Sequence, residues 1–330
     1  MKSTATANSN IALVKYWGKR DEELILPQNS SISMTLDGLY TTTTVEFSPK
    51  QKTDALSIDG EKIEGEEFER AFVQVEKIRK MAGVLDRARV VSESNFPKAA
   101  GLASSASGFA ALSLAATRAL ELDLDAKELS IISRQGSGSA CRSIYGGFVE
   151  WAKGTLEDGS DSYAKPIAPK DHWSELAMVV TVVTSKEKKV KSRAGMRQSV
   201  ANSPLYNMWL ETVDADLEKV RDGILEKKFT QLGVNAELNC LKMHSTMITT
   251  TPHIIYWAPE TIVMIKEVMA MREEGIEAYF TIDGGPQVKI LCLDRNAKKV
   301  QKRVAEMKEV QKTYVCHAGD GARIVEKGLF

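Results

Sequence analysis

The sequence of 330 residues lacks an excess of either charge, because Lys plus Arg and Asp plus Glu both number 44 and the formal net charge is zero. A protein that binds nucleic acid over a broad surface needs an excess of basic residues, so this class is disfavoured. The chain also lacks a run of about eighteen apolar residues and an N-terminal signal peptide, which disfavours membrane spanning and secretion. We therefore expect a cytoplasmic protein with no nucleic acid or membrane partner.

Residues that hold metals or form disulfides are few. The four cysteines are far apart and include no C-x-x-C pair, so a zinc site is disfavoured and free thiols in a reducing compartment are the simplest interpretation. The four histidines show no metal-ligand spacing and indicate no Ser-His-Asp triad. These residues are Cys141, Cys240, Cys292, Cys316, His172, His244, His253 and His317. The sequence leaves open whether Cys141 ever enters a disulfide.

The chain lacks the Walker A pattern G-x-x-x-x-G-K-[ST], yet one stretch suits phosphate by another design. Residues 95–107 read N-F-P-K-A-A-G-L-A-S-S-A-S, and residues 108–120 have the composition and apolar spacing of a helix. Small side chains let a ligand approach the backbone, and the N–H groups of a helix start favour an anion. The hydroxyls of Ser104, Ser105 and Ser107 add donors or a magnesium ligand. The alternative is a tightly packed helix start.

The order of predicted elements favours an α+β fold. Strands and helices are mixed without regular βαβ alternation, which argues against a doubly wound sheet. Because 330 residues exceed the usual range of one domain, we expect two closely packed domains that divide near Ser185. We predict strands at 40–47, 88–93, 177–184, 279–282 and 288–293. We predict helices at 66–82, 108–120, 127–133, 204–228, 230–247 and 261–274.

A basic cluster with aromatic neighbours lies near the N-terminus, where residues 10–20 read N-I-A-L-V-K-Y-W-G-K-R. Such a cluster could bind a compact polyanion, or it could be an ordinary solvated stretch anchored by Tyr16 and Trp17. The apolar run before Lys15 places this lysine close to the core. A buried lysine normally needs an anionic partner.

Two further segments combine small residues with positive charge. Residues 134–151 contain G-S-G-S followed by Arg142, and arginine holds a carboxylate or phosphate with two parallel hydrogen bonds. The alternative is a turn between two buried elements. Residues 186–197 carry six basic residues and one acidic residue after the predicted strand at 177–184. This segment is either a solvated loop or a ligand contact at a strand end.

Asp283 follows the predicted strand at 279–282 and precedes Gly-Gly-Pro. A carboxylate held on a rigid strand end beside a tight turn suits a positioned base. The alternative is an aspartate that caps its own turn.

Four motifs in this order resemble those of the diphosphomevalonate decarboxylase family of the GHMP kinase superfamily. They are N-I-A-x-x-K-Y-W-G-K-R from Asn10, F-P-x-A-A-G-L-A-S-S-A-S from Phe96, G-S-G-S-A-C-R-S from Gly136, and D-G-G-P from Asp283. The resemblance spans residues 4–286. It implies the GHMP kinase fold, with a left-handed βαβ unit and the ATP-phosphate loop in an N-terminal domain, 1–185, and a ferredoxin-like C-terminal domain, 186–330.

The resemblance also implies a reaction. Family members use ATP and Mg²⁺ to phosphorylate the 3-hydroxyl of mevalonate 5-diphosphate, and then lose phosphate and CO₂ to give isopentenyl diphosphate. Two alternatives stay open, a decarboxylase acting on mevalonate 5-phosphate and a GHMP kinase that does not decarboxylate. The chain has D-G-G-P-Q at 283–287 where the family commonly has D-A-G-P-N, and residues 255–259 resemble related phosphomevalonate decarboxylases.

Individual roles follow from the resemblance. The implied catalytic residues are Asp283, Arg142, Lys188 and Lys15, and sequence alone does not separate Lys188 from Lys189. The implied substrate-binding residues are Tyr16, Lys19, Ser137, Ser139, Arg142, Ser192 and Arg193. The implied ATP-binding residues are Ser94, Gly101, Leu102, Ala103, Ser104, Ser105 and Ser107, with Ser105 as the magnesium contact. The resemblance also implies a homodimer whose ligand is a small mevalonate phosphate.

Overall fold

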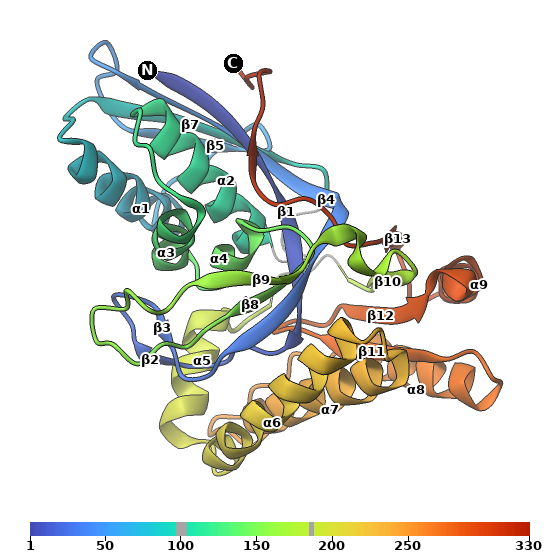
Figure 1. The fold of residues 1–330 in the computed structure, drawn as a ribbon. Helices are drawn as coiled ribbons and strands as arrows, with labels where there is room; N and C mark the ends of the chain where they lie inside the picture. The colour runs from blue at the N-terminus through green and yellow to red at the C-terminus, as the bar shows by residue number, and fades with distance from the viewer. Residues whose placement is uncertain (97–103, 185–187) are drawn as a thin grey trace.

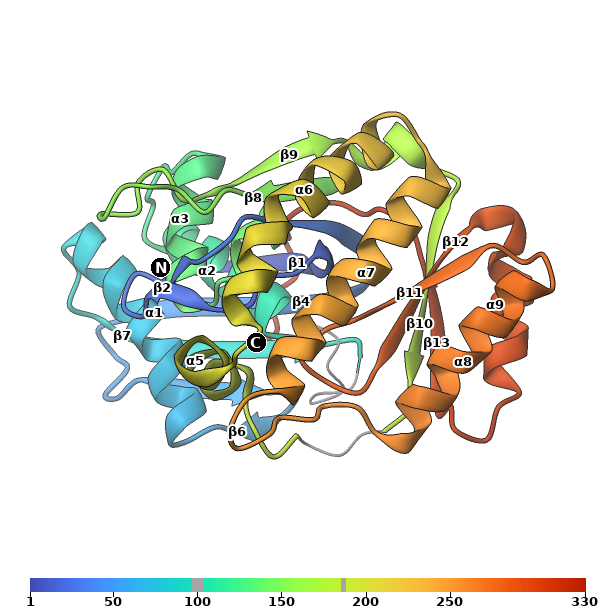
Figure 2. The same cartoon turned by 90° about the horizontal axis from the view of Figure 1, so that it is seen from below.

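The computed structural model describes residues 1–96, 104–184 and 188–330. Its strands form one sheet of eight strands, one of four, and a two-stranded ribbon. Helices pack against both larger sheets (Figures 1 and 2). This arrangement confirms the α+β class. Among the residues described, no helix has both the length and the apolar composition needed to cross a membrane.

The eight-stranded sheet holds the N-terminal residues. In spatial order it contains β14 (Arg323–Ile324), β1 (Lys2–Val14), β4 (Ser31–Ser48), β7 (Arg87–Ser94), β5 (Ala55–Ile58) and β6 (Glu61–Lys62), while β8 (Phe148–Trp151) pairs with β4 and β9 (Ala164–Ala168) pairs with β8. Strand β4 is long because its first part pairs with β8 and its second part with β7. The predicted strand at 40–47 is its second part. The ribbon is β2 (Lys19–Asp21) with β3 (Leu26–Pro27).

The four-stranded sheet is antiparallel throughout its described pairs. Its order is β11 (Ala278–Ile282), β12 (Val288–Leu293), β10 (Leu176–Val182) and β13 (Lys312–Cys316). The predicted strands at 177–184, 279–282 and 288–293 correspond to β10, β11 and β12. Strand β14 follows this sheet in the chain but returns to β1, where Ala5 faces Ile324. The division at residue 185 therefore stays a prediction.

The helices, like the strands, are spread along the described part of the chain. They are α1 (Glu66–Ala82), α2 (Ser104–Ala119), α3 (Ala126–Gly136), α4 (Ala140–Ser143), α5 (Ser192–Asn202), α6 (Tyr206–Leu225), α7 (Phe229–Ile248), α8 (Pro259–Glu273) and α9 (Asp294–Ala305), with a short 3-10 helix at Lys170–Trp173. Local signals set several boundaries. Asp125 and Glu128 form a capping box at the start of α3, and Gly83 takes the left-handed conformation that ends α1.

Helices α1, α2 and α3 cover one face of the first sheet (Figure 1). The alanines of α2 pack on small residues of β1, so the helix lies close to the strand. Ala110, Ala111 and Ala115 are fully buried in the same cluster as Ala5 and Ala7. The small side chains of α2 therefore place its N-terminus against the middle of the sheet.

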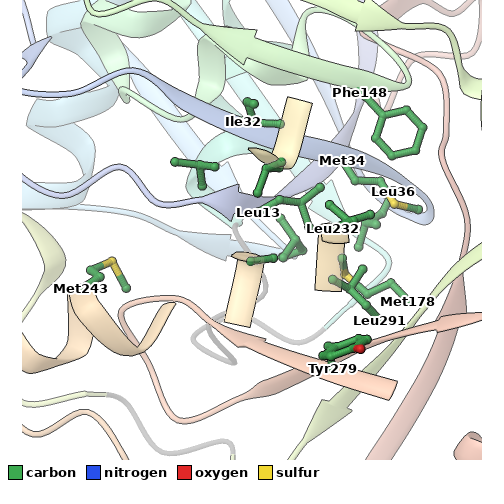
Figure 3. Close-up of a cluster of buried hydrophobic side chains, with 14 of the residues drawn as sticks. Leu13, Ile32, Met34, Leu36, Phe148, Met178, Leu232, Met243, Tyr279 and Leu291 are labelled. Carbon is green, nitrogen blue, oxygen red and sulfur yellow. The ribbon is translucent and has the colours of Figure 1, made fainter. Parts of the chain in front are cut away.

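The largest core joins the two sheets through the hairpin of α6 and α7. Figure 3 shows side chains from both sheets meeting those of α7. The labelled residues are Leu13, Ile32, Met34, Leu36, Phe148, Met178, Leu232, Met243, Tyr279 and Leu291. Since one continuous core contains β1, β4, β10 and β12, the ends of β1 and β11 are held in a fixed relation.

Four helices differ from the prediction. Helix α2 begins at Ser104, four residues before the predicted start, and residues 186–197, expected to be a solvated loop or a ligand contact, include the first part of α5. Helices α4 and α9 were not predicted. Helix α5 begins at Ser192 directly after the basic residues. The basic segment is thus part of a packed element over its second half.

Candidate functional site

A cavity of about 470 Å³ opens where β1, the start of α2, α4, α5 and the end of β11 converge. Of the residues that the structure describes, seven cationic side chains and three carboxylates line it. The cations are Lys15, Lys19, Arg70, Arg142, Lys188, Lys191 and Arg193, and the acids are Glu66, Glu67 and Asp283. This excess of positive charge suits a small ligand with several negative charges.

Asp283 directly follows β11 at the cavity wall, and two lysines face its carboxylate. Lys15 Nζ lies 2.6 Å from Oδ1, and Lys289 Nζ lies 3.4 Å from Oδ2. Both lysine side chains are 1% exposed, while that of Asp283 is 27% exposed. The adjoining turn is closed by the backbone, because Gly285 N donates to the carbonyl oxygen of Asp283 at 2.6 Å. The carboxylate therefore faces the lysines and the cavity.

The charge state of Asp283 follows from these neighbours. Burial by itself raises the pKa of the carboxyl, but the charges of Lys15 and Lys289 outweigh it and hold the pKa well below its usual range. Burial lowers the pKa of Lys289, which the Asp283 charge opposes. The carboxylate is ionised at neutral pH.

Lys15 occupies the position that the sequence predicted for it, since it is buried and has an anionic partner. Its Nζ also donates to the carbonyl oxygen of Ala12 at 2.9 Å. Its backbone is held from two sides: Lys15 N donates to Asn239 Oδ1 at 2.8 Å, and Asn29 Nδ2 donates to the Lys15 carbonyl at 2.7 Å. The ammonium position is thus fixed by β1 and α7 together.

Arg142 lies on α4 at the cavity wall and is 2% exposed. Its Nε donates to Asn10 Oδ1 at 3.1 Å, and its Nη1 donates to Ser31 Oγ at 2.6 Å. The guanidinium lies 5.9 Å from the ring centre of Trp151. Burial lowers the pKa of Arg142, but arginine stays charged in proteins. This is a rigid cation suited to a carboxylate.

Beyond the end of α3, Ser137 and Ser139 line the same wall as Tyr16. Within the described part of the chain, the buried Tyr16 hydroxyl has no hydrogen-bond partner, and burial raises the pKa of Tyr16 strongly. Its ring lies edge-on to Trp151, with 4.7 Å between centres. An unpaired buried hydroxyl at a cavity is a donor available to a ligand.

Three further predicted substrate contacts line the same cavity. Lys19 Nζ pairs with Glu22 Oε2 at 2.6 Å, and burial lowers the pKa of Lys19 despite that partner. Arg193, in the first turn of α5, donates from Nη2 to the carbonyl oxygen of Gly136 at 2.9 Å. The structure brings Lys19, Arg193 and Ser192 into one lining with Arg142.

Lys188 and its neighbour Lys189, which the sequence could not separate, differ in environment. Lys188 lines the cavity and donates to Ser192 Oγ and to the carbonyl oxygen of Gly284, both at 2.6 Å. Lys189 is exposed. Burial lowers the pKa of Lys188 to about 8, against the opposing charge of Asp283. The geometry favours Lys188 over Lys189 as the lysine of the cavity.

The predicted ATP-binding residues divide into three groups. Gly101, Leu102 and Ala103 lie outside the described residues. Ser104 and Ser105 line the cavity at the start of α2. Ser94 and Ser107 are not in the lining, and Ser107 is fully buried with its hydroxyl 2.8 Å from Thr41 Oγ1. Among the described residues, no cluster of three or more His, Cys, Asp or Glu could hold a metal.

Sequence reasoning missed Glu66 and Glu67 of the lining and three further residues of this site. Lys289 faces Asp283 from within β12, Arg70 lines the cavity from α1, and Asn10 holds Arg142. Burial lowers the pKa of Arg70, and the nearby charge of Arg193 lowers it further. The Arg70 guanidinium lies 4.6 Å from the ring centre of Phe109. Asn10 opens the first motif, so its position in that motif was a usable signal.

Comparison with known families matches nearly the whole chain. A family model described as the diphosphomevalonate decarboxylase-like N-terminal domain matches residues 7–164, and one described as the mevalonate 5-diphosphate decarboxylase C-terminal domain matches residues 178–325. The chain belongs to the diphosphomevalonate decarboxylase family. The family resemblance drawn from the four motifs is thereby confirmed.

Relatives of this family are similar along most of their length. Diphosphomevalonate decarboxylase from Candida albicans is 40% identical over 312 residues, which cover 90% of this chain and 86% of the relative. The bovine diphosphomevalonate decarboxylase (Bos taurus) is 39% identical over 310 residues, which cover 88% of this chain and 76% of the relative.

Solved structures of the family share the fold. Mevalonate diphosphate decarboxylase from Enterococcus faecalis has a TM-score of 0.92 at 40% identity, with 99% of both chains covered. The enzyme from Staphylococcus aureus has a TM-score of 0.92 at 40% identity, with 98% of both chains covered. A structure described as MDDEF in complex with MVAPP, AMPPCP and magnesium has a TM-score of 0.93 at 41% identity over 99% of both chains. The GHMP kinase fold is confirmed.

Proposed function

We propose that the chain catalyses the ATP-dependent decarboxylation of mevalonate 5-diphosphate to isopentenyl diphosphate. The observation that carries this proposal is that one cavity holds an ionised Asp283 between lysines and a buried Arg142. Asp283 is suited to orient a hydroxyl that accepts a phosphoryl group, and Arg142 is suited to bind a carboxylate. Relatives with these functions are similar along nearly the whole chain, and one solved relative is described with MVAPP, AMPPCP and magnesium.

The substrate carries negative charge at both ends, and the cavity offers cations for both. We assign the carboxylate to Arg142, with Ser137 and Ser139 beside it, because Arg142 is held rigidly by Asn10 and Ser31. We assign the 5-diphosphate to Tyr16, Lys19 and Arg193, and add Arg70 from its place in the lining. These assignments orient the 3-hydroxyl toward Asp283.

The nucleotide phosphates are assigned to the start of α2. Ser104 and Ser105 line the cavity there, and the first turn of α2 contains no acidic residue, so the helix start suits an anion. These hydroxyls also fit magnesium, which binds oxygen ligands and usually takes few of them from the protein. Ser105 would hold the ion, which when bound neutralises charge on the phosphates.

Asp283 accepts a hydrogen bond from the 3-hydroxyl and so directs a lone pair of the hydroxyl oxygen toward the phosphoryl group. Because Lys15 and Lys289 hold its pKa low, Asp283 contributes mainly by orientation and accepts the proton only as the oxygen–phosphorus bond forms. Lys188, held by Ser192 and the Gly284 carbonyl, places positive charge beside the transferring group.

The second stage breaks two bonds of the phosphorylated substrate. The tertiary carbon–oxygen bond breaks and its electron pair leaves with the phosphate. The bond to the carboxyl carbon then breaks, CO₂ departs, and that electron pair forms the double bond of the product. The fixed cations around the cavity stabilise the departing phosphate, and the low exposure of Lys15 and Arg142 keeps the reacting end poor in water.

The proposal is tested by incubating the protein with ATP, magnesium and mevalonate 5-diphosphate. We expect ADP, phosphate and CO₂ in equal amounts, with isopentenyl diphosphate identified by mass. Absence of CO₂ and ADP would sink the proposal, and a phosphorylated product without CO₂ would make the chain a kinase. Mevalonate 5-phosphate is the matched comparison. We expect the diphosphate to have the higher kcat/KM because Lys19, Arg70 and Arg193 offer cations to the distal phosphate.

We also propose that the protein is a cytoplasmic homodimer. Val234 and Leu238 lie one turn apart on α7 and are 48% and 43% exposed, which supports a contact with a second copy. The four cysteines are free and buried, which is compatible with a reducing compartment. Light scattering on the purified protein tests the dimer, and fractionation of cells that express it tests the location.

A further inference from the structure

A buried group of hydroxyls joins four elements beneath the start of α2. Thr41 Oγ1 on β4 lies 2.9 Å from Ser94 Oγ at the end of β7 and 2.8 Å from Ser107 Oγ on α2. Ser9 Oγ on β1 donates to Ser107 Oγ at 3.3 Å. We call these four residues, Ser9, Thr41, Ser94 and Ser107, the hydroxyl cluster.

Within the hydroxyl cluster, Thr41 is the member that contacts both Ser94 of β7 and Ser107 of α2. Ser94 precedes residues 97–103 in the sequence, and Ser107 follows them. A hydroxyl has one proton to donate and two lone pairs that accept, so Thr41 can satisfy both serines at once. Thr41 is 3% exposed and Ser107 is fully buried, so water does not readily replace either partner.

The cluster lies directly behind the serines that line the cavity. Ser107 is within one turn of Ser104 and Ser105 on α2, and its Oγ also approaches the carbonyl oxygen of Ser104 at 3.5 Å. The end of β7 has a second attachment, because Tyr40 N donates to Asn95 Oδ1 at 2.9 Å. We therefore expect a displacement of Thr41 to change the position of the first turn of α2 more than that of the end of β7.

We propose that Thr41 is a positioning residue for the nucleotide phosphates, which it serves by fixing the first turn of α2 against the end of β7. This inference rests on the proposed function, in which Ser104 and Ser105 contact those phosphates. It also gives Ser107 a role that differs from the direct ATP contact expected from the sequence, because its hydroxyl is used within the hydroxyl cluster.

The same strand supplies a matched control. Thr43 lies two residues further along β4, is fully buried, and forms a 2.8 Å hydroxyl bond to Ser92 of β7. It therefore shares the strand, the burial and the partner strand of Thr41, but its hydroxyl bond to Ser92 links β4 to β7 and does not involve α2. Thr41→Val and Thr43→Val each replace a hydroxyl by a methyl group of similar size.

The experiment measures the KM for ATP, the KM for mevalonate 5-diphosphate and the affinity for a non-hydrolysable ATP analogue. We expect Thr41→Val to raise the KM for ATP and weaken the analogue by about tenfold, because two neutral hydrogen bonds are lost. The KM for the diphosphate should stay within about twofold. Thr43→Val should leave the nucleotide values within about twofold, and Thr41→Ser should restore them. Unchanged nucleotide values in Thr41→Val, an equal rise in Thr43→Val, or a parallel rise of both KM values overturns the proposal.

A second variant covers the case in which Thr41→Val does not fold. Ser107→Ala removes the α2 side of the same contact and is expected to raise the KM for ATP several-fold. Combined with Thr41→Val or Thr41→Ala, it should add little, since both changes break one shared bond. Additive effects overturn the proposal. The analogue titration needs no turnover, so it separates failure of this inference from failure of the proposed reaction.

Discussion

At the scale of single residues, Lys188 sets a pH limit on the reaction. Its pKa is lowered to about 8 by burial, so its ammonium is charged below that pH and loses its proton above it. We expect kcat/KM, which reports the free enzyme, to fall as the pH rises through about 8. Lys188→Arg keeps a positive charge at every pH, because an arginine pKa exceeds about 12, and should move the alkaline limb to higher pH.

Lys189→Arg is the matched control for that profile. Lys189 is exposed and lies next to Lys188 in the chain, so its replacement should leave the alkaline limb unchanged. The profile is recorded between about pH 6 and 11, a range that includes the unperturbed lysine value. An alkaline limb that Lys188→Arg does not move would show that another group titrates.

Charged residues of the site could be predicted from the sequence where they belong to a motif. Charged residues that lie on a strand or helix outside any motif could not. Lys15 was placed near the core because an apolar run precedes it, and its buried pair with Asp283 confirms that. Lys289 lies between apolar residues near the start of β12, and a lone charged residue there is ordinarily expected to face solvent. Arg70 lies on the charged helix α1 and reads as part of a solvated face. Their burial depends on tertiary contacts.

At the scale of elements, the turn between α3 and α4 shapes the wall near Tyr16. A Cβ added to Gly138 would lie 2.8 Å from Tyr16 Cε1 and 2.9 Å from Trp151 Cη2. We expect Gly138→Ala to displace the Tyr16 ring and raise the KM for mevalonate 5-diphosphate about tenfold or more, since misplacement by about 1 Å is costly. The KM for ATP should change little, because Ser104 and Ser105 lie on another element.

Gly108→Ala is the matched control for that change. Gly108 lies inside α2, and no atom of the described residues lies within 4 Å of an added Cβ. An alanine there should stabilise the helix by about 0.5–1 kcal/mol and leave both KM values as they are. Steady-state kinetics with each substrate varied in turn distinguishes the two variants. Equal behaviour of the two would show that the wall at Gly138 is not tightly packed.

Elements with a strong apolar period were predictable, and those that depend on neighbours were not. Helix α1 matches its predicted bounds, since its period and its capping glycine agree. Helix α5 carries basic residues and Gly195, which favour a loop, yet that glycine lies where an added Cβ would come 2.6 Å from the Tyr256 hydroxyl. Helix α9 has a narrow apolar stripe, in which Ala297, Val300 and Val304 are buried. Packing stabilises both helices.

At the scale of the whole molecule, the site exists only where the two sheets meet. Lys15 directly follows β1 of the first sheet and Asp283 directly follows β11 of the second, and the two residues are 268 positions apart in the chain. Asn239 of α7 joins them indirectly, since it holds the backbone of Lys15 from within the shared core. The ion pair is therefore a contact between the two layers as well as part of the reaction site.

This double role predicts the effect of Asp283→Asn. Loss of the carboxylate leaves Lys15 and Lys289 buried without their shared anion, so the free energy of unfolding should fall by about 1–3 kcal/mol. That is below the about 3–5 kcal/mol typical of a fully buried pair, because the Asp283 side chain is 27% exposed. Turnover of the folded variant should fall about 10²- to 10⁴-fold, the range for loss of a positioned acid or base.

Glu237→Gln serves to separate the loss of stability from the loss of turnover expected for Asp283→Asn. Glu237 of α7 pairs with Arg272 of α8 at 2.8 Å, its side chain is 15% exposed, and both helices contact β11 of the second sheet. Its loss should lower stability comparably and leave turnover within about twofold, since surface and half-buried pairs away from a site act on folding alone. Urea unfolding and the rate of ADP release, measured on both variants, give the comparison. Near-normal turnover in Asp283→Asn would remove Asp283 from the reaction and leave it as a contact between layers.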